Sequence, residues 1–342
     1  MKKRTAFLLG LLSVAAAGGT AAYLRNKKLT SKYNFAGEYK RTLGITLSPK
    51  NINPSFIKFM NKMGKGKIKE IEDVITSSTF IPSYDGAKIL VNVIEPLECK
   101  KEEILPCLVY YHGGGYVIDS IPQYFSFMAQ YAKLAHCKVV YVHYRTAYEK
   151  TADTCFEDAY AGLLWAYENA ENLRIDRERI AVGGDSAGGG ISAAITHISR
   201  DRRGPKIAFQ MLIYPVIDAT LSTSSMQKFT DTPGWNAKAN KKMWKEVKKS
   251  LSPDMLKYAS PILNPDFSGL CNAYVEVEEY DCLHDEGLNY AEKLRENGYE
   301  VQINDMKGTY HGFEQSGEKM LGRQIFETRA AALCRAFQKE NA

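Results

Sequence analysis

The sequence predicts an α/β fold in which a mostly parallel, doubly wound sheet carries helices on both faces. Short apolar runs alternate with longer helical patterns from about residue 85 onward, which is typical of this class. The chain has 342 residues, 45% of them hydrophobic, which is enough for one large core. No segment repeats with the period of a solenoid or a propeller, so repeat architectures are excluded.

The expected strands are short, apolar and rich in β-branched residues. They cover residues 89–94, 108–111, 139–142, 180–182, 207–214, 274–277 and 301–306. The helical patterns cover residues 124–135, 152–169, 187–199, 285–297 and 320–337. Ligands of such sheets bind at the carboxyl ends of the strands, so we expect the functional site there.

Two stretches do not follow the alternation of strands and helices. Residues 29–75 are helical and polar, and residues 219–260 combine Ser, Thr and Pro with a lysine-rich helix. We expect both stretches to form a cap over the carboxyl edge of the sheet, within one catalytic domain of residues 29–342. The lysine-rich helix is interpreted as a solvated cap helix, and a surface that rests on anionic lipid is the alternative.

Residues 1–28 differ in charge from the rest of the chain. They hold six basic residues and no acidic one, which equals the whole formal net charge of +6. The remainder of the chain is therefore neutral. A protein that binds nucleic acid would spread its basic charge over the folded domain, so we expect no nucleic-acid partner.

An uncharged stretch of 20 residues, 5–24, lies between Arg4 and Arg25. A helix of this length spans a bilayer, and basic residues on both flanks favour a retained membrane anchor. A cleaved signal peptide, followed by secretion, is the alternative, because a basic start, a short apolar run and the small residues 15–17 fit that pattern. A buried helix of a soluble domain is the third interpretation.

The seven cysteines are scattered singly and form no C-x-x-C pair. Neither a disulfide framework nor a zinc site is indicated, so we expect free thiols and no metal.

Gly184-Asp185-Ser186-Ala187-Gly188 is a G-x-S-x-G sequence between an expected strand and an expected helix. A nucleophilic serine on a sharp strand-to-helix turn requires this context and these small neighbours. We therefore interpret Ser186 as a nucleophile, with an ordinary turn as the alternative. Asp185 is interpreted as structural.

The sequence His112-Gly113-Gly114-Gly115 follows the expected strand 108–111. Consecutive glycines let backbone N–H groups approach a substrate closely. Together with the N–H of Ala187, such groups would bind the oxyanion of a tetrahedral intermediate.

A nucleophilic serine needs a histidine base, and the base needs a carboxylate that orients it. In this fold the acid and the base follow the serine in the chain. His311 comes just after the last expected strand and is the favoured base, whereas His197 lies inside a helix and His284 at a helix start. Asp281, just past the strand 274–277, is the favoured acid. The other candidate acids are Glu278, Glu279, Asp285 and Glu286.

Four motifs in this order resemble the hormone-sensitive-lipase-like branch of the α/β-hydrolases, over a region from about residue 80 to the C-terminus. The matching motifs are His112-Gly113-Gly114-Gly115, Gly184-Asp185-Ser186-Ala187-Gly188-Gly189, Tyr280-Asp281-Cys282-Leu283-His284-Asp285-Glu286-Gly287 and His311-Gly312-Phe313. The resemblance implies the α/β-hydrolase fold and a triad of Ser186, Asp281 and His311. It also implies oxyanion donors at Gly114, Gly115 and Ala187.

The resemblance further implies a serine carboxylester hydrolase without metal or cofactor. We expect it to cleave short- to medium-chain acyl esters through an acyl-serine intermediate. Tyr116 and Val117, with side chains of the cap, are expected to shape the substrate pocket. The expected partners are a small-molecule ester and, through the N-terminal segment, a membrane; no oligomeric state is predicted.

This sequence departs from the family pattern at two places, and neither removes a triad member. His143-Tyr144-Arg145-Thr146-Ala147-Tyr148-Glu149 stands where the family has D-Y-R-L-A-P-E, and Cys282 stands where a proline usually follows the catalytic aspartate. Alternative functions are deacetylation or amide hydrolysis by the same triad, a lipase at a membrane surface, and a non-catalytic receptor on the same fold.

Overall fold

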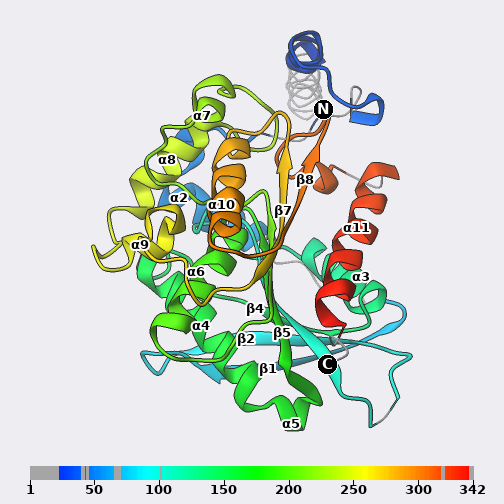
Figure 1. The fold of residues 1–342 in the computed structure, drawn as a ribbon. Helices are drawn as coiled ribbons and strands as arrows, with labels where there is room; N and C mark the ends of the chain where they lie inside the picture. Colours follow the sequence, from blue (N-terminus) through cyan, green and yellow to red (C-terminus); the bar gives the residue numbers. More distant parts are fainter. Residues whose placement is uncertain are drawn as a thin grey trace, which may run out of the picture.

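The computed structural model describes residues 23–39, 43, 46–64, 71–100, 102–316 and 320–338. Within these residues, eight strands form one sheet in the order β1-β2-β4-β3-β5-β6-β7-β8 (Figure 1). The strands are β1 (Val74–Pro82), β2 (Lys88–Pro96), β3 (Leu105–Tyr111), β4 (Lys138–Val142), β5 (Ile175–Asp185), β6 (Phe209–Ile213), β7 (Asn272–Glu278) and β8 (Val301–Met306).

The sheet is parallel from β4 to β8, and β1 and β2 add two antiparallel pairings at one edge. The predicted mostly parallel α/β fold is therefore confirmed. Strand β1 was not among the expected strands, because its residues are exposed on both faces along most of its length. An edge strand of this kind has no alternation of apolar and polar residues that the sequence could reveal.

Helices cover both faces of the sheet (Figure 1). One layer holds α4 (Ala152–Glu168), α6 (Ala187–Asp201) and α10 (His284–Glu296). The other layer holds α3 (Gln123–Leu134) and α11 (Met320–Phe337). These five helices agree with the expected helical patterns to within about two residues at each end.

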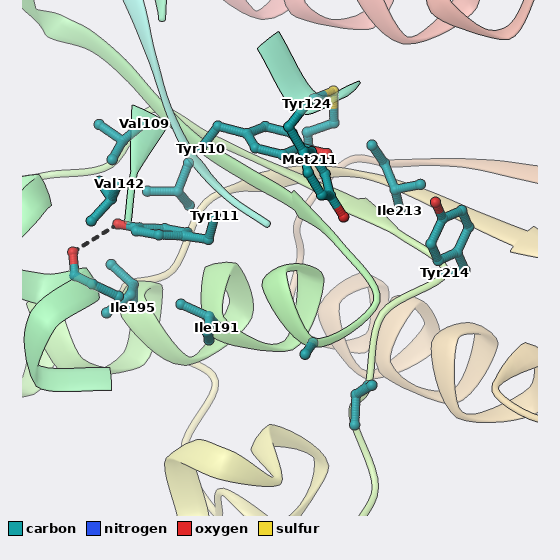
Figure 2. Close-up of a cluster of buried hydrophobic side chains, with 14 of the residues drawn as sticks. Val109, Tyr110, Tyr111, Tyr124, Val142, Ile191, Ile195, Met211, Ile213 and Tyr214 are labelled. Atoms are coloured by element: carbon teal, nitrogen blue, oxygen red, sulfur yellow. Dashed lines mark hydrogen bonds between the residues drawn. The ribbon is translucent and has the colours of Figure 1, made fainter. Parts of the chain in front are cut away.

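The main core lies between the sheet and these layers, and Figure 2 shows part of it. Tyr110 and Tyr111 are consecutive on β3 and point to opposite faces of the sheet. Tyr111 packs toward Ile191 and Ile195 of α6, and its hydroxyl donates to the backbone oxygen of Ala159 at 3.0 Å. Helix α6, which begins at Ala187, is therefore held tightly against the central strands.

The remaining helices come from the two expected cap regions. The N-terminal region contains a helix over residues 23–32, η1 (Gly37–Tyr39), η2 (Pro49–Asn51) and α2 (Pro54–Gly64). The later insertion contains α7 (Ser224–Lys228), α8 (Ala237–Val247), α9 (Leu256–Ala259) and η3 (Pro261–Leu263). Short α5 (Ala170–Leu173) precedes β5, and η4 (Phe313–Gln315) follows β8.

The two cap regions contact each other. Lys32 forms an ion pair with Asp231 at 2.7 Å, and the Tyr33 hydroxyl donates to the same carboxylate at 2.6 Å. Helix η2 also packs against α8. The division into one catalytic domain with a two-part cap stays a prediction, and these contacts support it.

The expected anchor or signal segment, residues 1–28, lies outside the described residues except for 23–28. Within the part of the chain that the structure describes, no helix combines the length and the apolar character needed to cross a bilayer.

Candidate active site

Ser186 stands at the turn between β5 and α6, with φ at 56°. This left-handed backbone conformation is unusual for a residue with a side chain and is typical of a nucleophile on a sharp turn. The two glycines of the motif, each two residues from Ser186, have no room for a Cβ atom. A Cβ on Gly188 would lie 2.0 Å from the backbone oxygen of Tyr111, and one on Gly184 would lie 2.4 Å from the backbone of Gly188. The two glycines of the motif are therefore required by close packing.

His311 and Asp281 lie beside this serine, although the three are far apart in the sequence. The Ser186 Oγ is 2.9 Å from the Nε2 of His311, and the His311 Nδ1 is 2.6 Å from the Oδ2 of Asp281. Asp281 is completely buried. A carboxylate at Nδ1 favours the tautomer with its proton on Nδ1, which leaves Nε2 free to accept the serine proton.

Neighbouring strands bring the acid and the base together. Asp281 follows β7 and His311 follows β8, and these strands are adjacent and parallel. The backbone N–H of Tyr280 donates to the oxygen of Thr309 at 3.1 Å, so the two loops are also tied directly.

The other candidate acids have different positions. The carboxylate of Glu279 accepts a hydrogen bond from the N–H of Gly308. Asp285 and Glu286 each accept from a backbone N–H near the insertion, that of Ser225 and that of Ile217 respectively. Glu278 is buried without a hydrogen-bond partner in the described part of the chain, and burial raises its pKa well above the usual range. Of these five carboxylates, Asp281 is the one within hydrogen-bond distance of the imidazole of His311.

The other candidate bases also lie elsewhere. His197 is buried in α6 with its Nε2 3.2 Å from the hydroxyl of Tyr290, and the Nδ1 of His284 lies 2.9 Å from the Oδ1 of Asp285. Burial lowers the pKa of His197 to about 3, so it remains neutral.

The glycine loop after β3 lies beside the same turn. Gly114 and Gly115 adopt φ values of 123° and 59°, which a side chain would strain. The N–H of Gly113 is already used, because it donates to Tyr124 and Asp185. No residue in the described part of the chain accepts a hydrogen bond from the N–H groups of Gly114 and Gly115. Ala187 is the first residue of α6, so its N–H also lacks an intrahelical acceptor.

Asp185 holds the glycine loop in place. Its carboxylate accepts from the hydroxyls of Tyr110 at 3.0 Å and Tyr124 at 2.6 Å, and from the N–H of Gly113 at 3.1 Å. Its position agrees with the structural role expected from the sequence. Burial raises the pKa of Asp185 to about 6.

We expect Asp185→Asn to raise the stability of the protein at pH 8 while it lowers the activity. The folded carboxyl binds its proton at a higher pH than the unfolded one, so the contribution of Asp185 to the stability of the natural protein rises as pH falls from about 6 toward 4. The amide has no charge to bury, so the variant should be more stable at pH 8 by about 1–3 kcal/mol. Its NH₂ group cannot accept a hydrogen bond, so kcat should fall about tenfold as the glycine loop loosens.

Urea unfolding of both proteins at pH 5 and pH 8, with kcat for an acetate ester, checks this prediction. Other buried carboxyls titrate in both proteins, so the difference between the two isolates Asp185. A stability difference that is the same at both pH values would contradict it.

Tyr116 and Val117, the expected pocket residues, are both buried just after the glycine loop. The ring of Tyr116 packs against Phe156 and Trp244, and its hydroxyl lies 2.6 Å from the position of a Cβ on Gly190. Tyr116 thus fills the space under the loop, and its contact with substrate stays a prediction.

The structure also places residues beside the triad that the sequence did not single out. The ring centroids of Tyr214 and His311 are 4.5 Å apart, and those of Trp235 and His311 are 6.5 Å apart. A Cβ on Gly115 would lie 3.2 Å from both Trp235 and Met243. Trp235 and Met243 belong to the insertion, and no local pattern there indicates which side chains turn toward the site.

Comparisons with known proteins point to one family. A family model described as alpha/beta hydrolase fold matches residues 108–315. Carboxylesterase NlhH of Mycobacterium tuberculosis (strain CDC 1551 / Oshkosh) is 37% identical over 234 residues, which covers 67% of this chain and 73% of that protein. Ethyl acetate hydrolase of Pseudomonas putida is 31% identical over 246 residues, covering 70% of this chain and 76% of that protein.

Solved structures give the same result. Bacterial heroin esterase matches with a TM-score of 0.77 and 31% identity, covering 85% of this chain and 93% of that one. The thermostable carboxylesterase EstE1, cloned from a metagenomic library, matches with a TM-score of 0.73 and 32% identity, covering 86% and 99%.

Proposed function

The chain belongs to the alpha/beta hydrolase fold family, and from this premise we propose that Ser186, His311 and Asp281 hydrolyse carboxylic esters through an acyl-serine intermediate. The chain is an enzyme of the carboxylesterase type. The observation that carries the assignment of residues is the pair of contacts at His311, 2.9 Å to Ser186 and 2.6 Å to Asp281.

In the proposed mechanism, the Oγ of Ser186 attacks the ester carbonyl while Nε2 of His311 accepts its proton. Asp281 holds the imidazole and stabilises its charged form. The N–H groups of Gly114, Gly115 and Ala187 bind the oxyanion, and each contributes about 3–4 kcal/mol to lowering the barrier. His311 then protonates the leaving alcohol, and water releases the acid from the acyl-serine by the reverse path.

The substrate is proposed to be an ester with a short- to medium-length acyl chain. Trp235 and Met243 of the cap lie against Gly115, so little space remains beside the oxyanion donors. Trp235 is itself buried, and its indole N–H donates to Asn240 at 3.2 Å, which fixes the ring.

Trp235→Ala is therefore expected to move the preference toward longer acyl chains. The ratio of kcat/KM for p-nitrophenyl octanoate to that for p-nitrophenyl acetate should rise about tenfold, because removal of the ring opens the wall of the site. A series of p-nitrophenyl esters measures this ratio. Trp165→Ala is the matched control and should leave the ratio unchanged, because Trp165 lies near the end of α4, just before β5 begins, whereas Ser186 follows the other end of β5.

The same series tests the function itself. Hydrolysis of no ester in the series would contradict carboxylester hydrolysis, whereas an unchanged ratio in Trp235→Ala would contradict only the role of the tryptophan. Release of nitroaniline from the matching anilides would favour the amidase alternative. A rate that jumps above the solubility limit of the ester would favour a lipase at a lipid surface.

Residues 1–28 are proposed to anchor the protein in a membrane, with secretion after cleavage as the alternative. The uncharged stretch 5–24 and its basic flanks support this proposal. Fractionation of cells that express the full chain, or a chain without residues 1–28, tests it; membrane association of both chains to the same extent would contradict it.

A further inference from the structure

Helix α2 exposes large apolar side chains to solvent. Phe59, Met60 and Met63 are 59%, 40% and 70% exposed. Phe59 and Met63 are four residues apart and so lie on one face of the helix, with Met60 beside them. Ile57, which lies on the side of the helix opposite to Phe59, is completely buried in the core. The exposed apolar face is therefore a second face of the helix, beyond the one that attaches it to the domain.

Basic side chains flank this apolar face. Lys58 and Lys62 are exposed, four residues apart and adjacent to Phe59 and Met63 on the helix. Exposed Lys50 precedes the helix in η2. In the part of the chain that the structure describes, none of these lysines forms an ion pair.

All charged residues in the sequence around α2 are basic. Between Glu38 and Glu70 the chain has eight basic residues and no acidic one. An ordinary solvated helix mixes acidic and basic residues, as α8 does where Glu246 pairs with Lys242 and with Lys249 just beyond its end. An apolar face beside unpaired lysines is the pattern of a helix that lies in the interface of an anionic membrane.

We propose that α2 is a docking surface for an anionic phospholipid bilayer. Phe59, Met60 and Met63 enter the boundary between headgroups and acyl chains, and Lys58 and Lys62 contact the phosphates and carboxylates of the headgroups. A neutral apolar partner would leave the positive charges of Lys58 and Lys62 without a counter-charge, so an anionic surface is the better match. This surface is distinct from the N-terminal segment and does not depend on the catalytic assignment.

Docking through α2 would place the candidate active site near the lipid. The side chain of Asn61, on α2, accepts from the backbone N–H of Asp119 at 3.1 Å. Asp119 lies four residues beyond Gly115 in the loop that carries the proposed oxyanion donors. Esters dissolved in the bilayer would then reach the site over a short path.

Site-specific photo-crosslinking of the full chain tests this proposal, because it reports on α2 even if residues 1–28 also bind lipid. Met63 is replaced by p-benzoylphenylalanine, and Ile104, which is 60% exposed just before β3, is replaced in the matched control. Each protein is irradiated with vesicles of phosphatidylcholine alone or mixed with phosphatidylserine. We expect lipid adducts at position 63, with a yield about tenfold higher on the anionic vesicles.

Lys58→Glu/Lys62→Glu in the same background is expected to remove the advantage of the anionic vesicles. Hydrolysis of a soluble acetate ester by this variant should be unchanged, which shows that the domain is folded. Equal yields at position 63 on both kinds of vesicle, or adducts at position 104 as frequent as at 63, would overturn the proposal. Adducts between position 63 and a second copy of the chain would identify a protein interface and overturn it as well.

Discussion

Ser186→Ala is expected to lower kcat for a soluble acetate ester by about 10⁵-fold or more. The Oγ of Ser186 lies 2.9 Å from the base and is the atom that would form the acyl bond, so alanine leaves no nucleophile. The residual rate would come from water bound near the oxyanion donors. The free energy of unfolding should change by only about 1 kcal/mol, because one hydroxyl and its hydrogen bond to His311 are lost.

Ser192→Ala is the matched control for this prediction. Ser192 lies on α6, six residues after Ser186, and its buried hydroxyl donates to the backbone oxygen of Gly188 at 2.8 Å. It offers a serine on the same helix without a histidine partner, so its removal should leave kcat nearly unchanged. A burst of p-nitrophenol from Ser186→Ala, or a loss of activity as large in Ser192→Ala, would contradict the assignment of the nucleophile.

Much of the site could be predicted because each part depends on local chemistry. The turn at Ser186 needs glycines on both sides, and the loop after β3 needs backbone without side chains, so both leave a readable motif. Asp281 and His311 were predicted from their places after the last two expected strands. The distances at His311 support that prediction, and activity measurements remain its test.

The fold was predictable where burial is regular. The bounds of β8 and α11 are those expected, because α11 repeats buried apolar residues along one face and the sequence of β8 alternates apolar and polar residues from Val301 to Asn304, although only Val301 is buried. Strand β1 was not predicted, since it pairs with β2 along an exposed edge and its central residues 76–79 are polar. Its position depends on backbone hydrogen bonds to a neighbour that no local pattern identifies.

Contacts between segments that are far apart in the chain could not be predicted from the sequence either. Trp235 reaches the site because the loop before α8 packs on His311, where a Cβ on Gly234 would lie 2.1 Å from the backbone oxygen of His311. Tyr214 reaches the imidazole from the end of β6. Neither residue carries a motif, so only the three-dimensional arrangement identifies them.

A cluster of buried charged side chains lies under the site, and its disruption is expected to destabilise the domain strongly. Arg329 of α11 is 1% exposed and forms a hydrogen-bonded ion pair with buried Glu276 of β7. Its other nitrogen lies 3.5 Å from the Oε1 of Glu314, which also accepts from the hydroxyl of Tyr214. Because the ring of Tyr214 packs on His311, this cluster connects the stability of the domain with the position of the base.

Arg329→Met is expected to lower the free energy of unfolding by about 3–5 kcal/mol. Methionine fills part of the volume of the arginine, but Glu276 and Glu314 would be left buried without their cation, and this desolvation cost dominates. Urea unfolding measures the loss. Arg335→Met on the same helix is the control: Arg335 is exposed, so the cost should stay below about 1 kcal/mol.

The double variant Arg329→Met/Glu276→Gln distinguishes an uncompensated charge from lost packing. If the carboxylate left behind causes the loss, the amide should recover at least about 1 kcal/mol of it, although it removes one more partner of the pair. If the double variant loses as much stability as the two single variants together, the electrostatic explanation is contradicted. The buried pair would then act through the shape and packing of the arginine side chain.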